Sequence, residues 1–353
     1  MCDFRPLWRV DAMTWLRNAW YQAGWSNEIS GDEPLVRTIL GEPVMFYRAG
    51  DGTVVALLDR CPHRFAPLSA GKIESDIVVC GYHGLAFGRD GLCARNPHGA
   101  ITSAMKVKAF TVVERHSAIW IWMGNSQDAN ADLIADLSFI DETPEKARIA
   151  GYMPTKCNYQ LLTDNILDLS HADYLHPTTL GGIITGAKAR SREEGGKVIA
   201  EWKSDGCKPP AAYRALVPNG LADIWTRVVW QAPALMVLDT GAKPAGVAPS
   251  PDDYSFTLHN MVPETETTTH YFFCVTRRYD LENEDFTRFL RSAVMQAFEN
   301  EDKPMLEKQQ ARIGTQDLMS LSPVLLSTDA AAVRARRVLQ QRIAQESATC
   351  LPS

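Results

Sequence analysis

Two short segments of the chain each pair a cysteine with a histidine, one as Cys-Pro-His and the other as Cys-Gly-Tyr-His. The four candidate ligands are Cys61, His63, Cys80 and His83. One thiolate and one imidazole from each segment provide the ligand set of a two-iron, two-sulfide cluster in which two histidines replace two cysteines on one iron. We therefore expect the two cysteines to bind the inner iron and the two histidines to bind the outer iron.

A structural zinc site is the alternative for these segments. In zinc fingers the cysteines form one close pair and the histidines form another. Here each segment mixes the two ligand types, and this mixture favours the iron–sulfur cluster known as a Rieske centre.

A second group of polar residues lies about eighty positions further along the chain. Asn165, Asp168 and His171 recur at intervals of three, so they share one face of the helix predicted over 159–173. Their neighbours are apolar, which indicates burial, and buried polar groups are paired or bound to metal. A solvated helix face is the alternative, and burial among apolar neighbours argues against it.

His176 follows His171 by five residues, which is too far round a continuous helix for the two imidazoles to bind one ion. Pro177 disfavours helical geometry at the residue before it, so we expect the helix to end before His176. Its side chain could then return to the same metal. Two imidazoles and one carboxylate form the iron site that leaves positions open for oxygen.

The carboxylate must come from a distant segment, and the acid-rich stretch 298–304 is the best candidate. The apolar positions of the preceding helix project Glu301 nearer to their own face than Asp302, but Pro304 disturbs the helix there. Spacing leaves Glu301 and Asp302 open as alternatives.

Composition excludes several classes of protein. The chain has 353 residues and a formal net charge of −6, which gives no basic surface for nucleic acid. It contains no run of about 18 apolar residues that could span a membrane. The first residues lack the apolar stretch of a secretory signal, so we expect a cytoplasmic enzyme whose other cysteines are reduced.

The pattern of short apolar runs and turns predicts an α+β protein with two domains. A small antiparallel β domain over 13–125 would carry the cluster loops, and 126–155 would connect it to a mixed domain over 156–353. The strands that we expect in the first domain are 35–40, 44–47, 54–58 and 119–122, with a hairpin turn at Asp51-Gly52. In the second domain we expect strands at 222–238, 255–262 and 267–277, and helices at 159–173, 284–301 and 329–346.

Taken together, the motifs Cys-x-His, Cys-x2-His and Asn-x2-Asp-x2-His-x4-His resemble the oxygenase component of Rieske non-heme iron oxygenases. The stretches most similar to the vanillate and dicamba O-demethylase group are 61–69, 164–171 and Glu301-Asp302, and those most similar to toluenesulfonate methyl-monooxygenase are 176–181 and 263–268. The resemblance begins near Met13, so residues 1–12 are expected to be an added or misannotated start, on which the family resemblance says nothing.

This resemblance implies an all-β Rieske [2Fe-2S] domain followed by a helix-grip (START-like) catalytic domain, in a head-to-tail homotrimer. It implies that Asp302 is the iron carboxylate and that Asn165 lies beside the iron. It also implies that Asp168 bridges His171 and His83 of the partner subunit, because electrons would cross between subunits.

The implied activity uses O2 and electrons from NADH, delivered by a separate flavin and iron–sulfur reductase, to hydroxylate a methyl or methoxy group of an aromatic acid. Methoxy groups would be lost as formaldehyde, and methyl groups would give benzylic alcohols. His259 is the candidate substrate contact, and the small Ala293 is expected to enlarge the substrate pocket. A ring-hydroxylating dioxygenase and a Rieske electron-transfer protein are the alternatives, but the latter leaves His171 and His176 unexplained.

Overall fold

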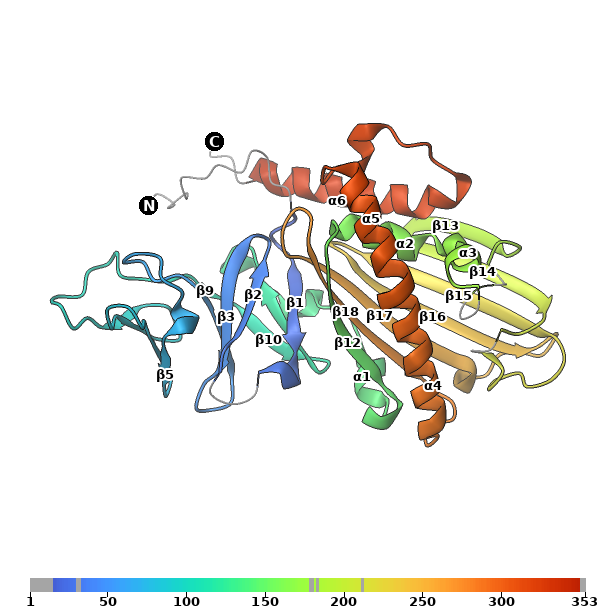
Figure 1. The fold of residues 1–353 in the computed structure, drawn as a ribbon, viewed down its shortest axis with the longest axis horizontal. Helices are drawn as coiled ribbons and strands as arrows, with labels where there is room; N and C mark the ends of the chain where they lie inside the picture. The colour runs from blue at the N-terminus through green and yellow to red at the C-terminus, as the bar shows by residue number, and fades with distance from the viewer. Residues whose placement is uncertain (1–14, 30–32, 178–180, 182–183, 211–212, 350–353) are drawn as a thin grey trace.

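The computed structural model describes residues 15–349, except 30–32, 178–180, 182–183 and 211–212. Figure 1 shows an elongated molecule with three small β-sheets toward one end and one large sheet, crossed by helices, toward the other. The expected α+β class is confirmed.

The N-terminal part contains three antiparallel sheets. One has the order β1-β11-β10 and consists of β1 (Trp20–Trp25), β11 (Ala118–Trp122) and β10 (Val112–Arg115). The second has the order β2-β3-β4-β9 and consists of β2 (Leu35–Ile39), β3 (Glu42–Arg48), β4 (Val54–Leu58) and β9 (Ala109–Phe110). The third lies at the left end of Figure 1 and consists of β5 (Lys72–Glu74), β6 (Ile77–Val79), β7 (Ala86–Phe87) and β8 (Cys93–Arg95).

The four strands expected in this part are confirmed, and so is the hairpin between β3 and β4. Gly52 has a φ of +84°, which glycine adopts at little cost. Strand β1 was not anticipated. Every residue of β1 is buried, so its sequence lacks the alternation of apolar and polar residues that identifies a half-exposed strand.

The C-terminal part is built on a seven-stranded antiparallel sheet with the order β12-β18-β17-β16-β15-β14-β13. Its strands are β12 (Ile149–Thr155), β13 (Lys188–Glu194), β14 (Lys197–Cys207), β15 (Ala222–Gln231), β16 (Leu235–Pro244), β17 (Tyr254–Pro263) and β18 (Thr269–Arg277). Its α-helices are α1 (Ser138–Glu142), α2 (Tyr159–Leu167), α3 (Ala172–Leu175), α4 (Glu284–Met295), α5 (Lys303–Ile313) and α6 (Ala330–Thr349), and a π-helix, Gln296–Asp302, joins α4 to α5. Helices α4 and α5 cross one face of the sheet, and α6 runs along its upper edge in Figure 1.

One predicted strand boundary in this part is wrong. The range 222–238 is not one strand but parts of β15 and β16, separated by a turn at Pro233, because proline cannot donate to the ladder. The expected connection 126–155 ends in the edge strand β12, which pairs with β18. Strand β13 was missed because its sequence is almost entirely polar and exposed.

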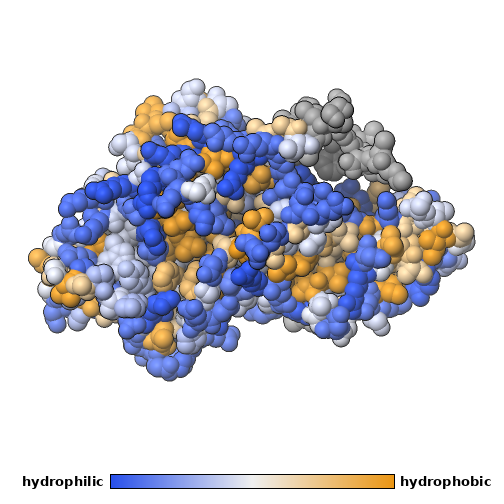
Figure 2. Space-filling view, turned by 180° about the vertical axis from the view of Figure 1, so that it is seen from behind, coloured by the Kyte–Doolittle hydropathy of each residue, from blue (hydrophilic) through white to orange (hydrophobic). Residues whose placement is uncertain are grey.

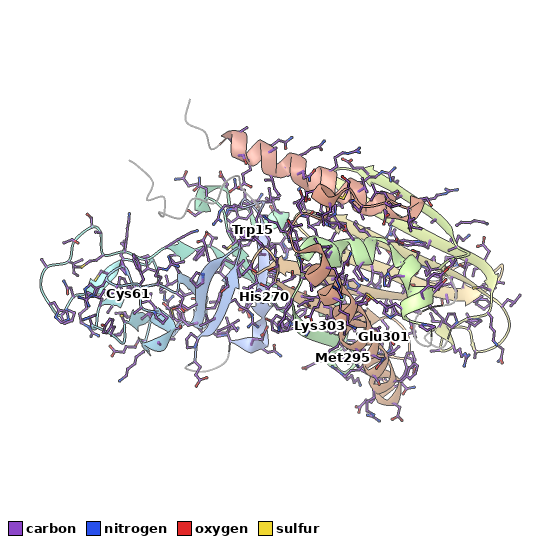
Figure 3. The ribbon with its side chains drawn as sticks, turned by 45° about the horizontal axis from the view of Figure 1, so that its top comes forward. Trp15, Cys61, His270, Met295, Glu301 and Lys303 are labelled. Carbon is purple, nitrogen blue, oxygen red and sulfur yellow. The ribbon has the colours of Figure 1, made fainter. Side chains whose placement is uncertain are left out.

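The two parts of the chain share one core, and main-chain and side-chain contacts join them. The Leu40 N–H donates to the Pro263 carbonyl at 2.9 Å, and His270 Nε2 lies 2.8 Å from the Thr38 carbonyl. Figure 3 shows His270, which belongs to β18 of the larger sheet, on the side of that sheet toward the lobe that contains Cys61. A smaller second core underlies the cysteine loops of that lobe.

The face opposite α4 and α5 is mostly hydrophilic, with scattered apolar patches (Figure 2). Within the described ranges, no helix combines the length and the apolar character needed to cross a membrane.

Candidate metal centres

The two cysteine loops have the same backbone design, although their cysteine-to-histidine spacings differ. In each loop the cysteine N–H donates to the carbonyl five residues later, and the cysteine carbonyl accepts from the N–H four residues later. The residue at this fourth place has a positive φ, 58° for Phe65 and 73° for Gly84. The two segments therefore reverse direction in the same way and present their side chains as a matched pair.

The four candidate ligands differ in how deeply they are buried. Cys61 and Cys80 are each 2% exposed, whereas His63 and His83 lie nearer to solvent with ring centroids 4.4 Å apart. Burial raises the pKa of the Cys61 thiol to about 11, and the adjacent Cys80 thiol adds to this effect. Two buried thiols beneath two outer imidazoles suit a cluster whose inner iron takes thiolates and whose outer iron takes histidines.

Asp59, which sequence reasoning missed, closes the base of the first loop. Its carboxylate accepts from the Ser69 N–H at 2.7 Å and from the Ser69 hydroxyl at 2.6 Å. His98 similarly supports the second loop, since its Nε2 donates to the His83 carbonyl at 2.9 Å.

The helix predicted over 159–173 is interrupted at Asp168, so the expected single face for Asn165, Asp168 and His171 is wrong. Asp168 leaves helical geometry with φ −127° and ψ 89°, and a short 3-10 turn, Leu169–His171, follows it. The Asp168 carboxylate accepts from the Ser170 N–H at 3.0 Å and caps this new turn. Such a local cap competes with continuation of the helix.

This interruption orients His171. Its Nδ1 donates to the main-chain carbonyl of Asp168 at 2.7 Å, so the contact within the chain involves this carbonyl and not the carboxylate. The expected end of the helix before His176 is confirmed, because α3 ends at Leu175 and His176 has φ −117° and ψ 44°.

The π-helix decides which acid faces the histidines. Its wider turn adds a residue between α4 and α5, so the α-helical count that favoured Glu301 does not apply. Asp302 is 6% exposed and is directed toward His171 and His176. Pro304 lies in the first turn of α5, where a proline is tolerated.

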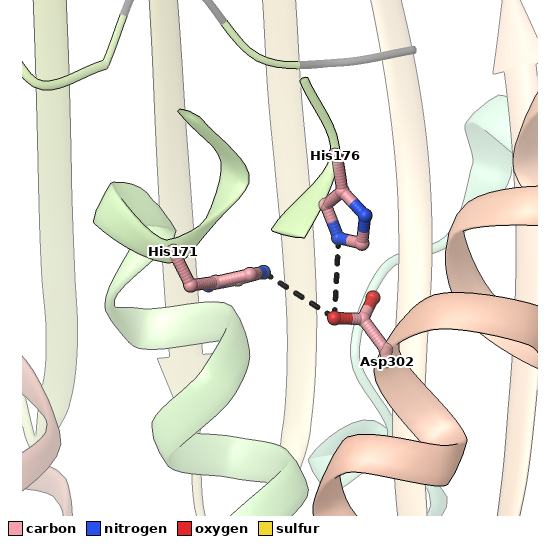
Figure 4. Close-up of side chains that lie close together, drawn as sticks. All are labelled: His171, His176 and Asp302. Atoms are coloured by element: carbon pink, nitrogen blue, oxygen red, sulfur yellow. Dashed lines mark hydrogen bonds and ion pairs between the residues drawn. The ribbon is translucent and has the colours of Figure 1, made fainter. Parts of the chain in front are cut away.

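Three ligand atoms from His171, His176 and Asp302 lie within 4.8 Å of one another (Figure 4). Asp302 Oδ1 is 3.4 Å from His171 Nε2 and 3.1 Å from His176 Nε2. Burial alone would raise the pKa of Asp302, but hydrogen bonds from the two imidazoles outweigh it and lower the pKa to about 2. The group is therefore a carboxylate facing two imidazoles, the donor set of a non-heme iron site.

Two neighbours hold this set in place. Asn165 Nδ2 donates to Asp302 Oδ1 at 3.2 Å. Glu301 accepts from His176 Nδ1 at 2.6 Å, which leaves Nε2 of that ring as the atom that would bind a metal. Gln296 in turn donates to Glu301 at 3.1 Å. The sequence left Glu301 and Asp302 as alternatives for the iron carboxylate. In the structure Asp302 faces both imidazoles, and Glu301 accepts a hydrogen bond from His176.

A cavity of about 180 Å³ opens beside the three residues, between the sheet and α4. His259 lines it, 2% exposed, with Nδ1 2.6 Å from the Tyr271 hydroxyl. Burial lowers the pKa of His259 to about 3, so the ring is neutral at physiological pH. The cavity is bordered by Leu290 and Val294 of α4, and Ala293 is not among its lining residues.

Comparison with known families agrees with both centres. Residues 19–110 match the Rieske [2Fe-2S] domain, and residues 155–345 match the vanillate O-demethylase oxygenase C-terminal domain. The chain belongs to the vanillate and dicamba O-demethylase group of Rieske oxygenases. It is an oxygenase component, and its cofactors are a Rieske [2Fe-2S] cluster and non-heme iron.

Relatives of this oxygenase match over nearly their whole length. The oxygenase component of dicamba O-demethylase from Stenotrophomonas maltophilia is 37% identical over 93% of this chain and 98% of its own. The iron–sulfur subunit of the toluene-4-sulfonate monooxygenase system from Comamonas testosteroni is 37% identical over 96% of this chain and 99% of its own. The vanillate O-demethylase oxygenase subunit of a Pseudomonas species is 34% identical over 94% of this chain and 95% of its own.

Solved structures confirm the fold of the oxygenase. The crystal structure of dicamba monooxygenase bound to dicamba has a TM-score of 0.87 and 36% identity, and the match covers 95% of this chain and 100% of the other. A structure of dicamba monooxygenase with non-heme iron and dicamba has a TM-score of 0.82.

Proposed function

We propose that this oxygenase inserts one oxygen atom of O2 into a C–H bond of a methyl or methoxy group on an aromatic acid. The observation that carries the proposal is the placement of His171, His176 and Asp302 on a cavity of about 180 Å³. An engineered cavity of about 150 Å³ holds benzene, so this cavity suits a single substituted ring. The names of the relatives, which include dicamba, vanillate and toluene-4-sulfonate systems, support an aromatic acid.

The products follow from the group attacked. Two electrons and two protons reduce the second oxygen atom of O2 to water. A hydroxylated methoxy group loses formaldehyde and leaves a phenol, whereas a hydroxylated methyl group remains as a benzylic alcohol.

We assign Cys61 and Cys80 to one iron of the cluster and His63 and His83 to the other. Their burial, matched loops and ring positions support this assignment. Sulfur ligands suit the buried iron, and the outer imidazoles can carry protons and electrons toward a neighbouring site.

We assign His171, His176 and Asp302 to the mononuclear iron. When bound, the cluster and the iron supply electron transfer and oxygen activation. The protein holds the ligand set through contacts at Nδ1 of each imidazole, from the Asp168 carbonyl and from Glu301. The Asn165 amide donates to Asp302 and fixes the direction of that carboxylate.

We further propose a head-to-tail homotrimer in which electrons cross between subunits. Figure 3 shows Cys61 in the outer lobe, well separated from Glu301 beside the iron site, which supports transfer from a neighbour rather than within one chain. Asp168 would make the link. Its carbonyl contacts His171, and its carboxylate would accept from His83 of the partner subunit.

We propose a division into a Rieske domain over 13–125, a connection over 126–155 and a catalytic domain over 156–353, supported by the matched segments 19–110 and 155–345.

A reductase must supply the electrons, and we propose a flavin and iron–sulfur protein that takes them from NADH. Phe65 and Tyr82 lie in the two cluster loops, are 70% and 60% exposed, and offer apolar contacts for a protein partner. We place the oxygenase in the cytoplasm, where its cysteines stay reduced.

The experiment combines metal analysis with product analysis. Purified oxygenase should contain cluster iron, sulfide and one further iron per chain, and it should give a Rieske-type electron paramagnetic resonance signal when reduced. With a reductase, NADH and a panel of methyl- and methoxy-substituted aromatic acids under labelled O2, one labelled oxygen should enter the organic product. A cis-diol containing two labelled oxygens would show a dioxygenase instead.

A further inference from the structure

Three hydroxyl groups meet on the wall of the cavity, on segments that are distant in sequence. Thr240 Oγ1 lies 2.7 Å from the Tyr213 hydroxyl and 3.0 Å from Thr226 Oγ1. It also lies 2.8 Å from the main-chain carbonyl of Trp225. Tyr213, Thr226 and Thr240 all line the cavity.

The carbonyl fixes the direction of every proton in this group. A carbonyl oxygen can only accept, so the single proton of Thr240 is donated to Trp225. The two remaining lone pairs of Thr240 then accept from Tyr213 and from Thr226. Burial raises the pKa of Tyr213, so its phenol keeps the proton that this arrangement needs.

The result is a polar patch that can accept hydrogen bonds from a ligand but cannot donate them. Tyr213 and Thr226 have already donated their protons to Thr240, so toward the cavity they offer only lone pairs. We call Tyr213, Thr226 and Thr240 the acceptor patch. A buried acceptor without a partner costs free energy, and a ligand that donates a hydrogen bond removes this cost.

The acceptor patch lies away from the iron site. Thr240 pairs with Ser255, which precedes His259 by four residues on β17, and a strand advances roughly 13 Å over that distance. His259 contacts Phe298 at the end of the cavity nearest the iron ligands, with ring centroids 5.6 Å apart. A substrate ring can therefore lie between the two ends of the cavity.

Ser255 and Tyr279 also line this part of the cavity. Ser255 donates to the Tyr279 hydroxyl at 3.3 Å, so the Tyr279 proton remains available for an acceptor on the ligand. A hydroxyl group on the ligand can donate to the acceptor patch and accept from Tyr279, whereas fluorine, a halogen of similar size, cannot donate.

We propose that the acceptor patch is a specificity subsite for a hydrogen-bond donor, in particular a ring hydroxyl, carried by the substrate away from the methyl or methoxy group that reacts. The proposal rests on the proposed function, because it assumes that an aromatic acid occupies this cavity. It narrows the substrate class to hydroxylated aromatic acids.

The test measures binding without turnover. The iron-loaded oxygenase is kept anaerobic without reductase and titrated calorimetrically with 3-methoxybenzoates that carry either a hydroxyl or a fluorine at ring position 4, and with the same pair at position 5. One hydrogen bond to an acceptor that has no other donor among the described residues should make the hydroxylated member of at least one pair bind about fivefold more tightly.

Two variants test the proton assignment. Thr240→Val removes the acceptor for the Tyr213 and Thr226 protons, which then turn toward the ligand, so the preference for hydroxyl over fluorine should disappear or reverse. Tyr213→Phe removes one acceptor of the patch and should bring the ratio of dissociation constants toward one. Thr257→Val makes the same chemical change as Thr240→Val on another threonine that lines the cavity, and it should leave the ratio unchanged.

Each outcome has a defined meaning. Equal affinities within both pairs in the wild type, or an unchanged ratio in Tyr213→Phe, would overturn the subsite but leave the proposed function standing. If none of the four compounds binds but the panel of methyl- and methoxy-substituted acids is turned over, the subsite is overturned and the proposed function stands. If that panel is not turned over either, the aromatic acid substrate itself is wrong.

Discussion

At the scale of single residues, the adjacent acids Glu301 and Asp302 make different contacts with the histidines. Asp302 faces both imidazoles, whereas Glu301 accepts from the far nitrogen of His176. A carboxylate behind a histidine ligand fixes its ring orientation and makes the ring a better electron donor to the metal. Loss of the carboxylate that faces both imidazoles should therefore weaken iron binding more than loss of the carboxylate that only orients His176.

We predict that Asp302→Ala abolishes binding of the mononuclear iron, and that Glu301→Ala lowers iron affinity by about 10- to 100-fold, so that excess iron restores it. Iron content and affinity are measured in protein whose cluster spectrum is intact. Glu299→Ala, an exposed acid on the same turn, is the control. Stronger iron loss in Glu301→Ala than in Asp302→Ala would exchange the two assignments.

At the scale of elements, the iron site depends on a local departure from regular helix. Residues 296–302 form a π-helix between α4 and α5, and the broken helix at Asp168 turns His171 toward it. The extra residue in the π-helix lets Asp302 point to the same side as the apolar face of α4. In a regular α-helix of the same sequence, Asp302 would point about 100° away from that side.

Deletion of Glu299 tests this element directly. Shortening the π-helix by one residue should restore α-helical spacing and move Asp302 into the position of Glu301, which that spacing turns toward the apolar face of α4. We therefore expect the deletion variant to keep both the mononuclear iron and the Rieske signal. Glu299→Ala, which keeps the length, should also bind iron. Loss of the iron after the deletion would show that the π-helix does more than shift Asp302 by one position along the helix.

At the scale of the whole molecule, the cluster lobe and the iron site are held apart within one chain, and a shared core joins the parts between them. In the homotrimer that we propose, electrons would cross between subunits instead of spanning this separation. Asp168 and the two histidines that we assign to the outer iron are the groups through which one subunit would reach the next.

We predict that Asp168→Asn retains both metals yet loses nearly all turnover, because a neutral amide is a weaker acceptor for a histidine of the partner subunit. A mixing experiment tests the direction of transfer. A Cys61→Ser chain, which lacks the cluster, is assembled with an Asp302→Ala chain, which lacks the iron, and mixed trimers should recover part of the activity. Inactive mixed trimers of confirmed mass would rule out transfer between subunits.

Stability should depend on pH through the contact between the two parts of the chain. Burial lowers the pKa of His270, which is 4% exposed and contacts Thr38 and Tyr152. Below the unfolded-state pKa of about 6.5, the unfolded chain binds a proton that the folded chain excludes, so stability falls as pH decreases, by at most about 1.4 kcal/mol per pH unit.

We therefore expect the melting temperature to fall between pH 6.5 and pH 5 more steeply in the wild type than in His270→Gln, which cannot titrate. The difference between the two proteins isolates His270 from other titrating groups. Parallel curves would exclude this histidine as a source of the pH dependence.

The sequence alone determined the chemistry of the oxygenase. The mixed cysteine and histidine pairs specified a Rieske cluster because their ligands lie within single loops, where spacing and residue type are sufficient. The two candidate iron histidines were found for the same reason, and Pro177 correctly indicated that the helix ends before His176. Long strands such as β17 and β18 were also predictable from their apolar runs.

Tertiary structure decided what local patterns could not. The choice of Asp302, and the support that Glu301 gives to His176, depend on a π-helix that follows no simple period in the sequence. The acceptor patch joins Tyr213, Thr226 and Thr240 from separate segments, and its proton directions depend on the distances among them. Strand register and side-chain packing bring such groups together, because they determine which residues meet across the fold, and local spacing does not contain that information.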